Sequence, residues 1–330
     1  GLGYLYFRQG RYAEAEPLYL KSRDIWQWYL GLDHPLVATS LSNLADLYQS
    51  QGRYQEAESL YRQALNINQQ HLGQSHPNVA SDLNGLAVLC KSQGRYQEAE
   101  SFCRQALNIN QQHLGQSHPG VASIMINLAA ICESQGRYEE AELLYQQALE
   151  IKRQRLGEDH PDVAKALDCL AGLYQLQGRY EEGEPLYLQA LKIKRQRLGE
   201  DHPDVAQSLN NLAYFYFFQS RYKEAETLYI QALQIAQKTL GESHPNVAVV
   251  LNGLATIYTA LDQYSEAEKL YLHAISITYH QLGEAHPSTK NTWGCFILLL
   301  KLVAQKNRTS ELSDHPMTRS LLQQLQTEES

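Results

Sequence analysis

The chain has 330 residues, more than a single compact core usually organises, so either several domains or an array of repeats is expected. Apolar residues make up 43% and charged residues 19%, a balance typical of a folded chain and not of a disordered one. The formal net charge of -8 argues against nucleic acid as the partner, because proteins that bind a phosphate backbone usually carry a basic face.

A His-Pro pair recurs at a constant interval along the chain. Its histidines are residues 34, 76, 118, 160, 202, 244 and 286, and each interval is 42 residues. Such a period is typical of stacked repeats, in which each unit buries its apolar face against its neighbours. We therefore expect an all-α solenoid of antiparallel helix-turn-helix units.

The 42-residue period divides the chain into one partial repeat and six full repeats. Residues 1–34 supply a partial N-terminal repeat, and residues 35–286 hold six repeats of 42 residues. In the repeat that begins at Pro77, apolar residues at intervals of three and four predict a first helix to Gln93 and a second helix from Tyr96 to Leu114. Gly94 and Gly115 suit the left-handed positions that end helices.

The C-terminal part departs from this pattern. Residues 287–306 predict one further first-type helix that caps the last repeat, and residues 307–330 form a polar tail, either a short helix or disordered. The longest apolar run, from Trp293 to Leu300, is too short to span a bilayer, and no signal peptide opens the chain. Five cysteines without CxxC spacing fit reduced thiols. We expect a cytoplasmic protein without a membrane partner.

The residues that vary least between repeats resemble a known family. Leu44, Ala45, Tyr48, Gly52, Tyr54, Ala57, Tyr61 and Ala64 follow the tetratricopeptide pattern of small and large residues. The strings Leu-Gly-Glu-Asp-His-Pro-Asp-Val-Ala (156–164) and Asn-Asn-Leu-Ala (210–213) resemble the repeats of kinesin light chains and of their prokaryotic relatives. The resemblance implies a right-handed superhelix whose first helices line a concave groove that takes peptides in extended form.

Metal and catalytic sites are not favoured by the repeat pattern. Stacked helices lie about 8–10 Å apart, so successive histidines cannot share one ion, and each is expected to help start a helix. Cys90, Cys103 and Cys132 replace tyrosines of other repeats, which predicts inert buried thiols. No Ser, His and Asp constellation and no phosphate-binding Gly loop stands out. We expect no metal, no cofactor and no enzymatic activity.

The residues that flank the repeated Leu-Ala pair are expected to face the groove. They vary while the core repeats, which indicates either a surface that reads a partner or solvated positions that drift. Because the Asn before the Leu-Ala pair contacts peptides in kinesin-light-chain repeats, the resemblance transfers that role to Asn84, Asn210 and Asn252. The neighbouring amides that share this role are Asn43, Asn127 and Asn211. Asp168 interrupts the amide pattern in the middle of the groove.

Two further features bear on the partner. Lys91 and Lys165 are the basic residues expected to face the groove, too few to favour acidic peptides. In the run 214–218 the repeat needs only Tyr216 as core, so Tyr214 with Phe217 or Phe218 is expected to form an outward aromatic patch that suits an apolar anchor. The alternative is tighter packing of this repeat against Ile230.

These patterns predict a non-catalytic protein–protein interaction scaffold that binds a peptide or partner protein in the groove, with self-association as a further option. An alternative is a ligand-sensing or self-association segment of a larger signalling protein of the ATPase or protease type, since related prokaryotic arrays are often fused to such modules. An enzyme lacks a catalytic cluster, and RNA binding is disfavoured by the acidic balance.

Overall fold

The structure, a computed structural model, describes residues 1–328, which form sixteen α-helices, one 3-10 helix and no strand. They are α1 Leu2–Arg8, α2 Tyr12–Leu30, α3 Pro35–Ser50, α4 Tyr54–Leu72, α5 Pro77–Ser92, α6 Tyr96–Leu114, α7 Pro119–Ser134, α8 Tyr138–Leu156, α9 Pro161–Leu176, α10 Tyr180–Leu198, α11 Pro203–Phe218, α12 Tyr222–Leu240, α13 Pro245–Ala260, α14 Tyr264–Leu282, α15 Pro287–Gln305, η1 Thr309–Glu311 and α16 Pro316–Glu328.

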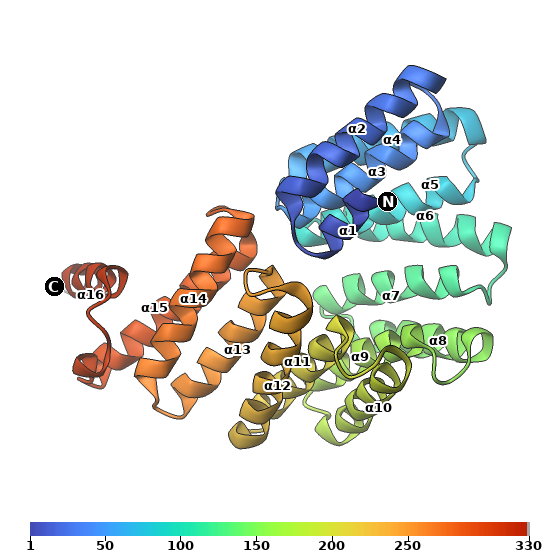
Figure 1. Cartoon of the computed structure of the whole chain (residues 1–330). Coiled ribbons are helices and arrows are strands. Elements are labelled where there is room, and N and C mark those ends of the chain that lie inside the picture. The colour runs from blue at the N-terminus through green and yellow to red at the C-terminus, as the bar shows by residue number, and fades with distance from the viewer. Residues whose placement is uncertain (329–330) are drawn as a thin grey trace. The chain divides into compact units, whose positions relative to one another are not determined.

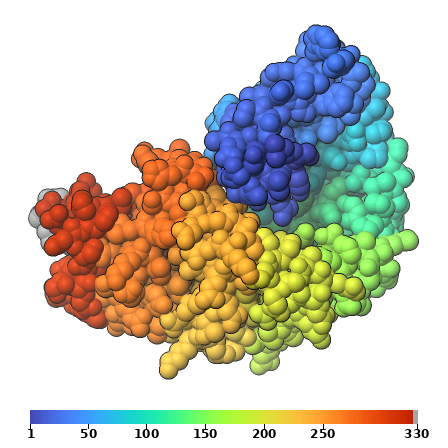
Figure 2. Space-filling view, viewed as in Figure 1, coloured from blue at the N-terminus to red at the C-terminus, as the bar shows by residue number. Residues whose placement is uncertain are grey.

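Two compact units divide the chain, Gly1–Leu198 with α1–α10 and Gly199–Ser330 with α11–α16. Within each unit the hairpins follow one another in chain order (Figure 1). Figure 2 shows the same order on the surface of each unit, where neighbouring colours occupy neighbouring zones. This is the arrangement expected for repeats that contact only their neighbours.

The His-Pro pair starts each first helix by a common device. The histidine lies just before the helix in extended conformation, and its Nδ1 accepts a hydrogen bond from the backbone N–H two residues later, at 3.1 Å for His76 and Asn78. Proline follows at the first helical position, where its missing N–H costs nothing. The same bond forms at His34, His118, His160, His202, His244 and His286. The prediction that these histidines start helices is confirmed.

The turn between the two helices of a repeat needs a left-handed residue. Gly94 has φ +75°, and the N–H of the next residue, Arg95, donates to the carbonyl of Cys90 at 2.9 Å. Glycine adopts this conformation without strain. Two later repeats place Ser220 and Asp262 there, with φ of 58° and 59°. The turn geometry is therefore kept even where glycine is lost.

Small and large side chains interlock between the helices. Within each unit, first helices pack on their own second helices and second helices pack on the next first helix. Successive first helices also touch from α3 to α9 and from α11 to α15. Ala87 and Ala129 are fully buried, and Tyr145, 2% exposed, lies in the same core cluster. Burial of these repeated positions forms a series of hydrophobic clusters along each unit, which confirms the predicted all-α solenoid of helical repeats.

Ion pairs join consecutive repeats on the outside of the turns. Arg95 lies 2.6 Å from Glu58 of the preceding repeat and 2.6 Å from Glu98 at the start of its own second helix. Arg53, Arg137 and Arg179 repeat this arrangement. Partly exposed pairs of this kind stabilise little individually, so they serve mainly to fix the register of one hairpin on the next.

The C-terminal segment closes this series. Glu268 occupies the position of Glu58 in the last repeat and is fully buried. Its carboxylate accepts hydrogen bonds from the N–H and hydroxyl of Ser313, at 2.7 and 2.8 Å, and from Thr318. Leu321 and Leu325 of α16 pack on the core of α14 and α15. Residues 309–311 and 316–328 of the polar tail are thus helical, and residues 329–330 lie outside the described part.

Candidate functional site

No metal centre forms around the periodic histidines. In residues 1–328, no three His, Cys, Asp or Glu side chains lie close enough together to hold a metal ion. The histidine Nδ1 atoms are already engaged as helix caps.

The cysteines that replace core tyrosines are buried, as the sequence predicts. Burial raises the pKa of the Cys103 thiol to about 12 and that of Cys132 to about 11. A thiol attacks as its thiolate, so both are unreactive at neutral pH. These residues fill the core and supply no nucleophile.

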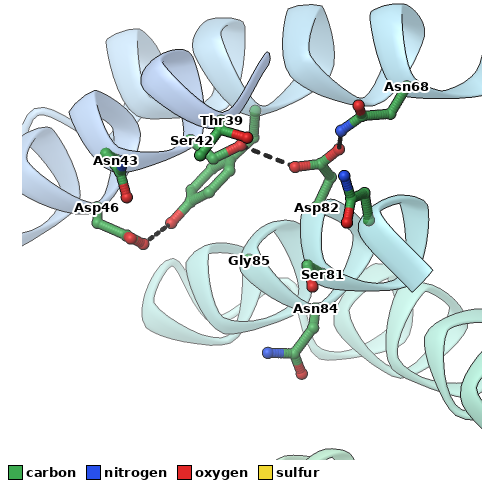
Figure 3. Close-up of a pocket in the computed structure, with 11 residues that line it drawn as sticks. Thr39, Ser42, Asn43, Asp46, Asn68, Ser81, Asp82, Asn84 and Gly85 are labelled. Atoms are coloured by element: carbon green, nitrogen blue, oxygen red, sulfur yellow. Dashed lines mark hydrogen bonds between the residues drawn. The ribbon is translucent and has the colours of Figure 1, made fainter. Parts of the chain in front are cut away.

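In the described residues, each unit holds a pocket that opens between neighbouring first helices. The first, here called the polar pocket, lies between α3, α4 and α5 and has a volume of about 390 Å³ (Figure 3). Its lining consists of Thr39, Ser42, Asn43, Asp46, Tyr61, Asn68, Asn78, Ser81, Asp82, Asn84 and Gly85. Every charged residue in this lining is an aspartate.

A hydrogen-bonded network builds the interior of the polar pocket. Asp82 on α5 is 3% exposed, and its carboxylate accepts from the Ser42 hydroxyl at 2.7 Å and from the Asn68 amide at 2.6 Å (Figure 3). Asp46 on α3 accepts from the hydroxyl of Tyr61 on α4 and remains partly open to solvent. The two carboxylates thus enter the pocket from different helices, one at its mouth and one in its interior.

The pocket holds negative charge at a cost. Desolvation raises the pKa of Asp82, the hydrogen bonds from Asn68 and Ser42 oppose the shift, and the charge of Asp46 adds to it. Desolvation likewise raises the pKa of Asp46, against the hydrogen bond from Tyr61. The pKa of Tyr61 is raised by burial and by both carboxylates. Any bound cation would relieve these shifts.

The second pocket, here called the aromatic pocket, lies between α11, α12, α13 and α15 and has a volume of about 310 Å³. Its lining consists of Asn210, Tyr214, Phe217, Tyr229, Val249, Asn252, Gly253, Thr256 and Asn291. A neighbouring hollow of about 290 Å³ shares Val249, Asn252 and Asn291. Asn252 therefore stands between two adjoining hollows, with aromatic rings on one side.

The aromatic run 214–218 divides between surface and core. Tyr214 and Phe218 are 49% and 48% exposed, and their rings meet edge to face at 4.8 Å. Phe217 is half-buried beside them and lines the pocket. The expectation that only Tyr216 serves the core was wrong, because Phe215 is fully buried as well. Its position is a core position in every repeat, held elsewhere by Leu or Ile, as at Leu89 and Ile131.

The remaining site residues named by the sequence lie outside both pockets. Asn127 donates to the side-chain carbonyl of Asn84 at 2.8 Å, and Asn211 accepts from Gln207 at 2.8 Å. Lys165 is exposed and lies 3.4 Å from Asp162 in its own helix.

Lys91 and Asp168 are engaged with other groups. The charge of half-buried Lys91 opposes the upward pKa shift that burial imposes on Glu133. Asp168 forms an ion pair with Lys194 of α10 at 2.6 Å, with the two side chains 10% and 4% exposed. Among the sequence-derived residues, the polar pocket thus gathers Asn43 and Asn84, and the aromatic pocket gathers Asn210, Tyr214, Phe217 and Asn252.

The sequence analysis did not predict the residues that shape the floors and interiors of the pockets. A Cβ at Gly85 would lie 2.5 Å from the Tyr61 ring, and one at Gly253 would lie closer still to the Tyr229 ring. These glycines let tyrosines of the second helices reach the pocket floors. Asp82 and Asn68 were missed too, although Asp82 is the one acidic residue among the seven at its register position.

A wider hollow of about 510 Å³ lies on the second helices α6 and α8. Its lining includes Leu143, Ile151 and the side-chain amides of Gln111, Gln116, Gln146 and Gln147, but no asparagine of a first helix. It is therefore a competing surface for an extended peptide within the described residues.

The geometry defines a class of protein: helical hairpins stacked in chain order within each unit, an all-α solenoid of helical repeats. Every helix in residues 1–328 is too short or too polar to traverse a lipid bilayer.

Comparison with known proteins identifies the family within this class. A family model for the tetratricopeptide repeat matches residues 1–70, 78–154, 162–214 and 204–280. Among solved structures, BtubC (BKLC) from P. vanneervenii is 28% identical with a TM-score of 0.54, over 71% of this chain and 92% of that chain. A putative kinesin light chain from Podosopora anserina, with nearly identical TPR-like repeats, is 30% identical with a TM-score of 0.50, over 62% and 98%. No curated protein gives a significant match.

The chain belongs to the tetratricopeptide repeat family, and its repeats are of the kinesin-light-chain-like kind. The family resemblance found in the sequence is therefore confirmed. Proteins of this family generally mediate protein–protein interactions and generally act as scaffolds and not as enzymes.

Proposed function

We propose that the surface formed by the first helices binds a partner protein through an extended peptide segment, and that the chain acts as a non-catalytic scaffold. The observation that carries this proposal is the location of the two pockets. Both open between successive first helices, and the asparagines that line each pocket include one from each of two neighbouring first helices: Asn43 and Asn84, and Asn210 and Asn252.

Paired amides suit an extended backbone. An asparagine side chain both donates and accepts, so it can bind the N–H and C=O of one peptide unit without regard to its side chain. Asn84, Asn210 and Asn252 hold equivalent register positions, one or more periods of 42 residues apart. Asn210 and Asn252 lie on neighbouring first helices of one unit and line one pocket, which supports contacts to successive parts of an extended segment.

The pocket linings define what the segment presents between these backbone contacts. The aromatic pocket offers Tyr214 and Phe217 to an apolar or aromatic side chain. No lysine, arginine or histidine lines either pocket, and Lys165 already lies beside Asp162. An acidic segment therefore has no counter-charge in either pocket.

The test begins with peptides selected for binding to the whole chain from a displayed library of random 12-residue sequences. Their affinities are measured by fluorescence anisotropy for the wild type and for the double variant Asn210→Ala, Asn252→Ala. Loss of two neutral hydrogen bonds should weaken binding roughly tenfold, while helicity and melting stay nearly unchanged.

The matched control is the double variant Asn66→Ala, Asn108→Ala, since these asparagines are exposed on the second helices α4 and α6. It should bind as the wild type does. Binding that survives loss of Asn210 and Asn252 and fails in the control would place the partner on the second helices and overturn the proposal.

A further inference from the structure

The carboxylate of Asp82 is buried without a cation. Its partners are the neutral groups of Ser42 and Asn68, and within residues 1–328 neither Asp82 nor Asp46 takes part in an ion pair. Burying a charge without an opposite charge is costly, and such groups are normally paired or bound to a metal. The polar pocket therefore offers two carboxyl groups that the described part of the protein does not pair with a cation.

The scaffold does not require this charge. The residues equivalent to Asp82 in the other repeats are all uncharged: Ser40, Ile124, Ala166, Ser208, Val250 and Thr292. All of them are buried in the same way, so a neutral residue satisfies the packing. The aspartate is a local feature of the polar pocket and not a structural element of the repeat.

Two later repeats supply their own cation at the position of Asn68. The equivalent residues Lys152 and Lys194 are buried, and they lie 3.7 Å from Asp162 and 2.6 Å from Asp168. In the polar pocket this position holds Asn68, which is 2% exposed, and whose Oδ1 has no hydrogen-bond partner. The pocket thus lacks the internal lysine and gains an unused acceptor.

Resting on the proposed function, we propose that the polar pocket receives an arginine or lysine side chain of the bound segment. Asp46 at the mouth, Asp82 in the interior and the Oδ1 of Asn68 are acceptors on three helices, α3, α5 and α4. A guanidinium or ammonium group supplies only donors and a positive charge, which is what these atoms leave unsatisfied. The occupant is thus the basic residue of a peptide.

The probe is N-acetyl-arginine N-methylamide, titrated into the ¹⁵N-labelled whole chain, with the side-chain amides of Asn68 and Asn84 as reporters. The same amide of citrulline, which has nearly the same shape and no charge, serves as the neutral comparison. We expect saturable shifts with arginine and an apparent affinity at least about tenfold lower with citrulline.

Asn68→Lys places an internal cation beside Asp82, as Lys152 and Lys194 do elsewhere, and should abolish the arginine response at Asn84. Asn110→Lys is the matched control. Asn110 holds the same register position one repeat later, where the residue equivalent to Asp82 is Ile124, so the polar pocket is untouched. This variant should bind arginine as the wild type does. Circular dichroism of both variants checks that they fold.

Several outcomes overturn the inference. They are equal response to arginine and citrulline, retained arginine binding in Asn68→Lys, and reporter shifts that Ca²⁺ or Mg²⁺ alone produces while arginine does not. If selected peptides depend on Asn210 and Asn252 but arginine gives no response, the inference fails and the proposed function stands. If arginine binds but no peptide engages the first helices, the proposed function fails and the pocket remains a site for a basic group.

Discussion

The polar pocket and the aromatic pocket are built on the same register positions and present opposite chemistry. Both lie between successive first helices, and both have a second-helix tyrosine, Tyr61 or Tyr229, that reaches the floor over a glycine. Above its floor, the polar pocket presents two aspartates, and the aromatic pocket presents aromatic rings. The comparison shows that the repeat fixes where a pocket forms, while a few substitutions decide what it holds.

Among the aromatic residues 214–218, substitution of Phe215 is expected to lower stability most. Phe215→Ala should lower the free energy of unfolding by about 3–5 kcal/mol, because a fully buried ring leaves a cavity. Phe218→Ala, three residues away and half exposed, should change it by less than about 0.5 kcal/mol. Urea denaturation of both variants measures the contrast. Equal effects would mean that the whole run 214–218 is core.

Glycine substitutions test whether the floors of the two pockets are built in the same way. Gly85→Ala and Gly253→Ala should each cost about 1–3 kcal/mol, because the new Cβ would meet the Tyr61 or Tyr229 ring. Gly294→Ala, where a Cβ meets no atom within 4 Å, should be neutral or stabilise by about 0.5–1 kcal/mol through helix propensity. Thermal melting compares the three. Tolerance of alanine at only one of the two pockets would show that their floors differ.

Most of this scaffold was predictable from the sequence, because each position is seen seven times. The helices, the histidine caps, the glycine turns and the buried cysteines all follow from local spacing that repeats every 42 residues. The groove residues could be named for the same reason, by their offset from the Leu-Ala pair.

The pockets' chemistry was harder to predict, because it depends on residues that break the repeat. Asp82 stands at a core position, and its partners Ser42 and Asn68 come from the preceding repeat, so no local pattern joins them. The available signal was the singular charge at position 82 and the Lys-to-Asn exchange at position 68. Phe215 was misassigned because an aromatic run hides which of its members takes the leucine position.

The charge in the polar pocket predicts a dependence of stability on pH. A carboxylate whose pKa is raised by folding favours the folded state most below its unfolded pKa, and that contribution is lost as the pH rises through the folded value. Asp82→Asn removes the titrating group, so this loss of stability with rising pH disappears. The side chain of Asn68 can rotate so that its Oδ1 accepts a hydrogen bond from the new amide. The variant should therefore be more stable than the wild type at pH 7, by on the order of 1 kcal/mol.

Urea denaturation of Asp82→Asn and wild type at pH 7 and at pH 4 checks the sign of this effect. The advantage of the variant should be largest at pH 7 and shrink toward pH 4, where Asp82 becomes protonated. A variant that is less stable than the wild type at pH 7 would mean that the ionised carboxylate stabilises the fold.

The smallest expected difference concerns the two floor tyrosines. Tyr61→Phe removes the hydrogen bond to Asp46 and should cost about 0.5–1 kcal/mol. Within the described residues the Tyr229 hydroxyl makes no comparable bond, so Tyr229→Phe should cost less than about 0.5 kcal/mol. Melting temperatures of the two variants compare these costs. An equal cost at both sites would contradict the hydrogen bond assigned to Tyr61 and Asp46.

The measurement that tests the central claim most directly is site-specific photocrosslinking of a selected peptide. The photoreactive residue p-benzoylphenylalanine replaces either Tyr214 on the first helix α11 or Tyr279 on the second helix α14, two tyrosines of nearly equal exposure at 49% and 48%. Binding along the first helices predicts a crosslink from position 214 and none from position 279. A crosslink from position 279 alone would contradict the account.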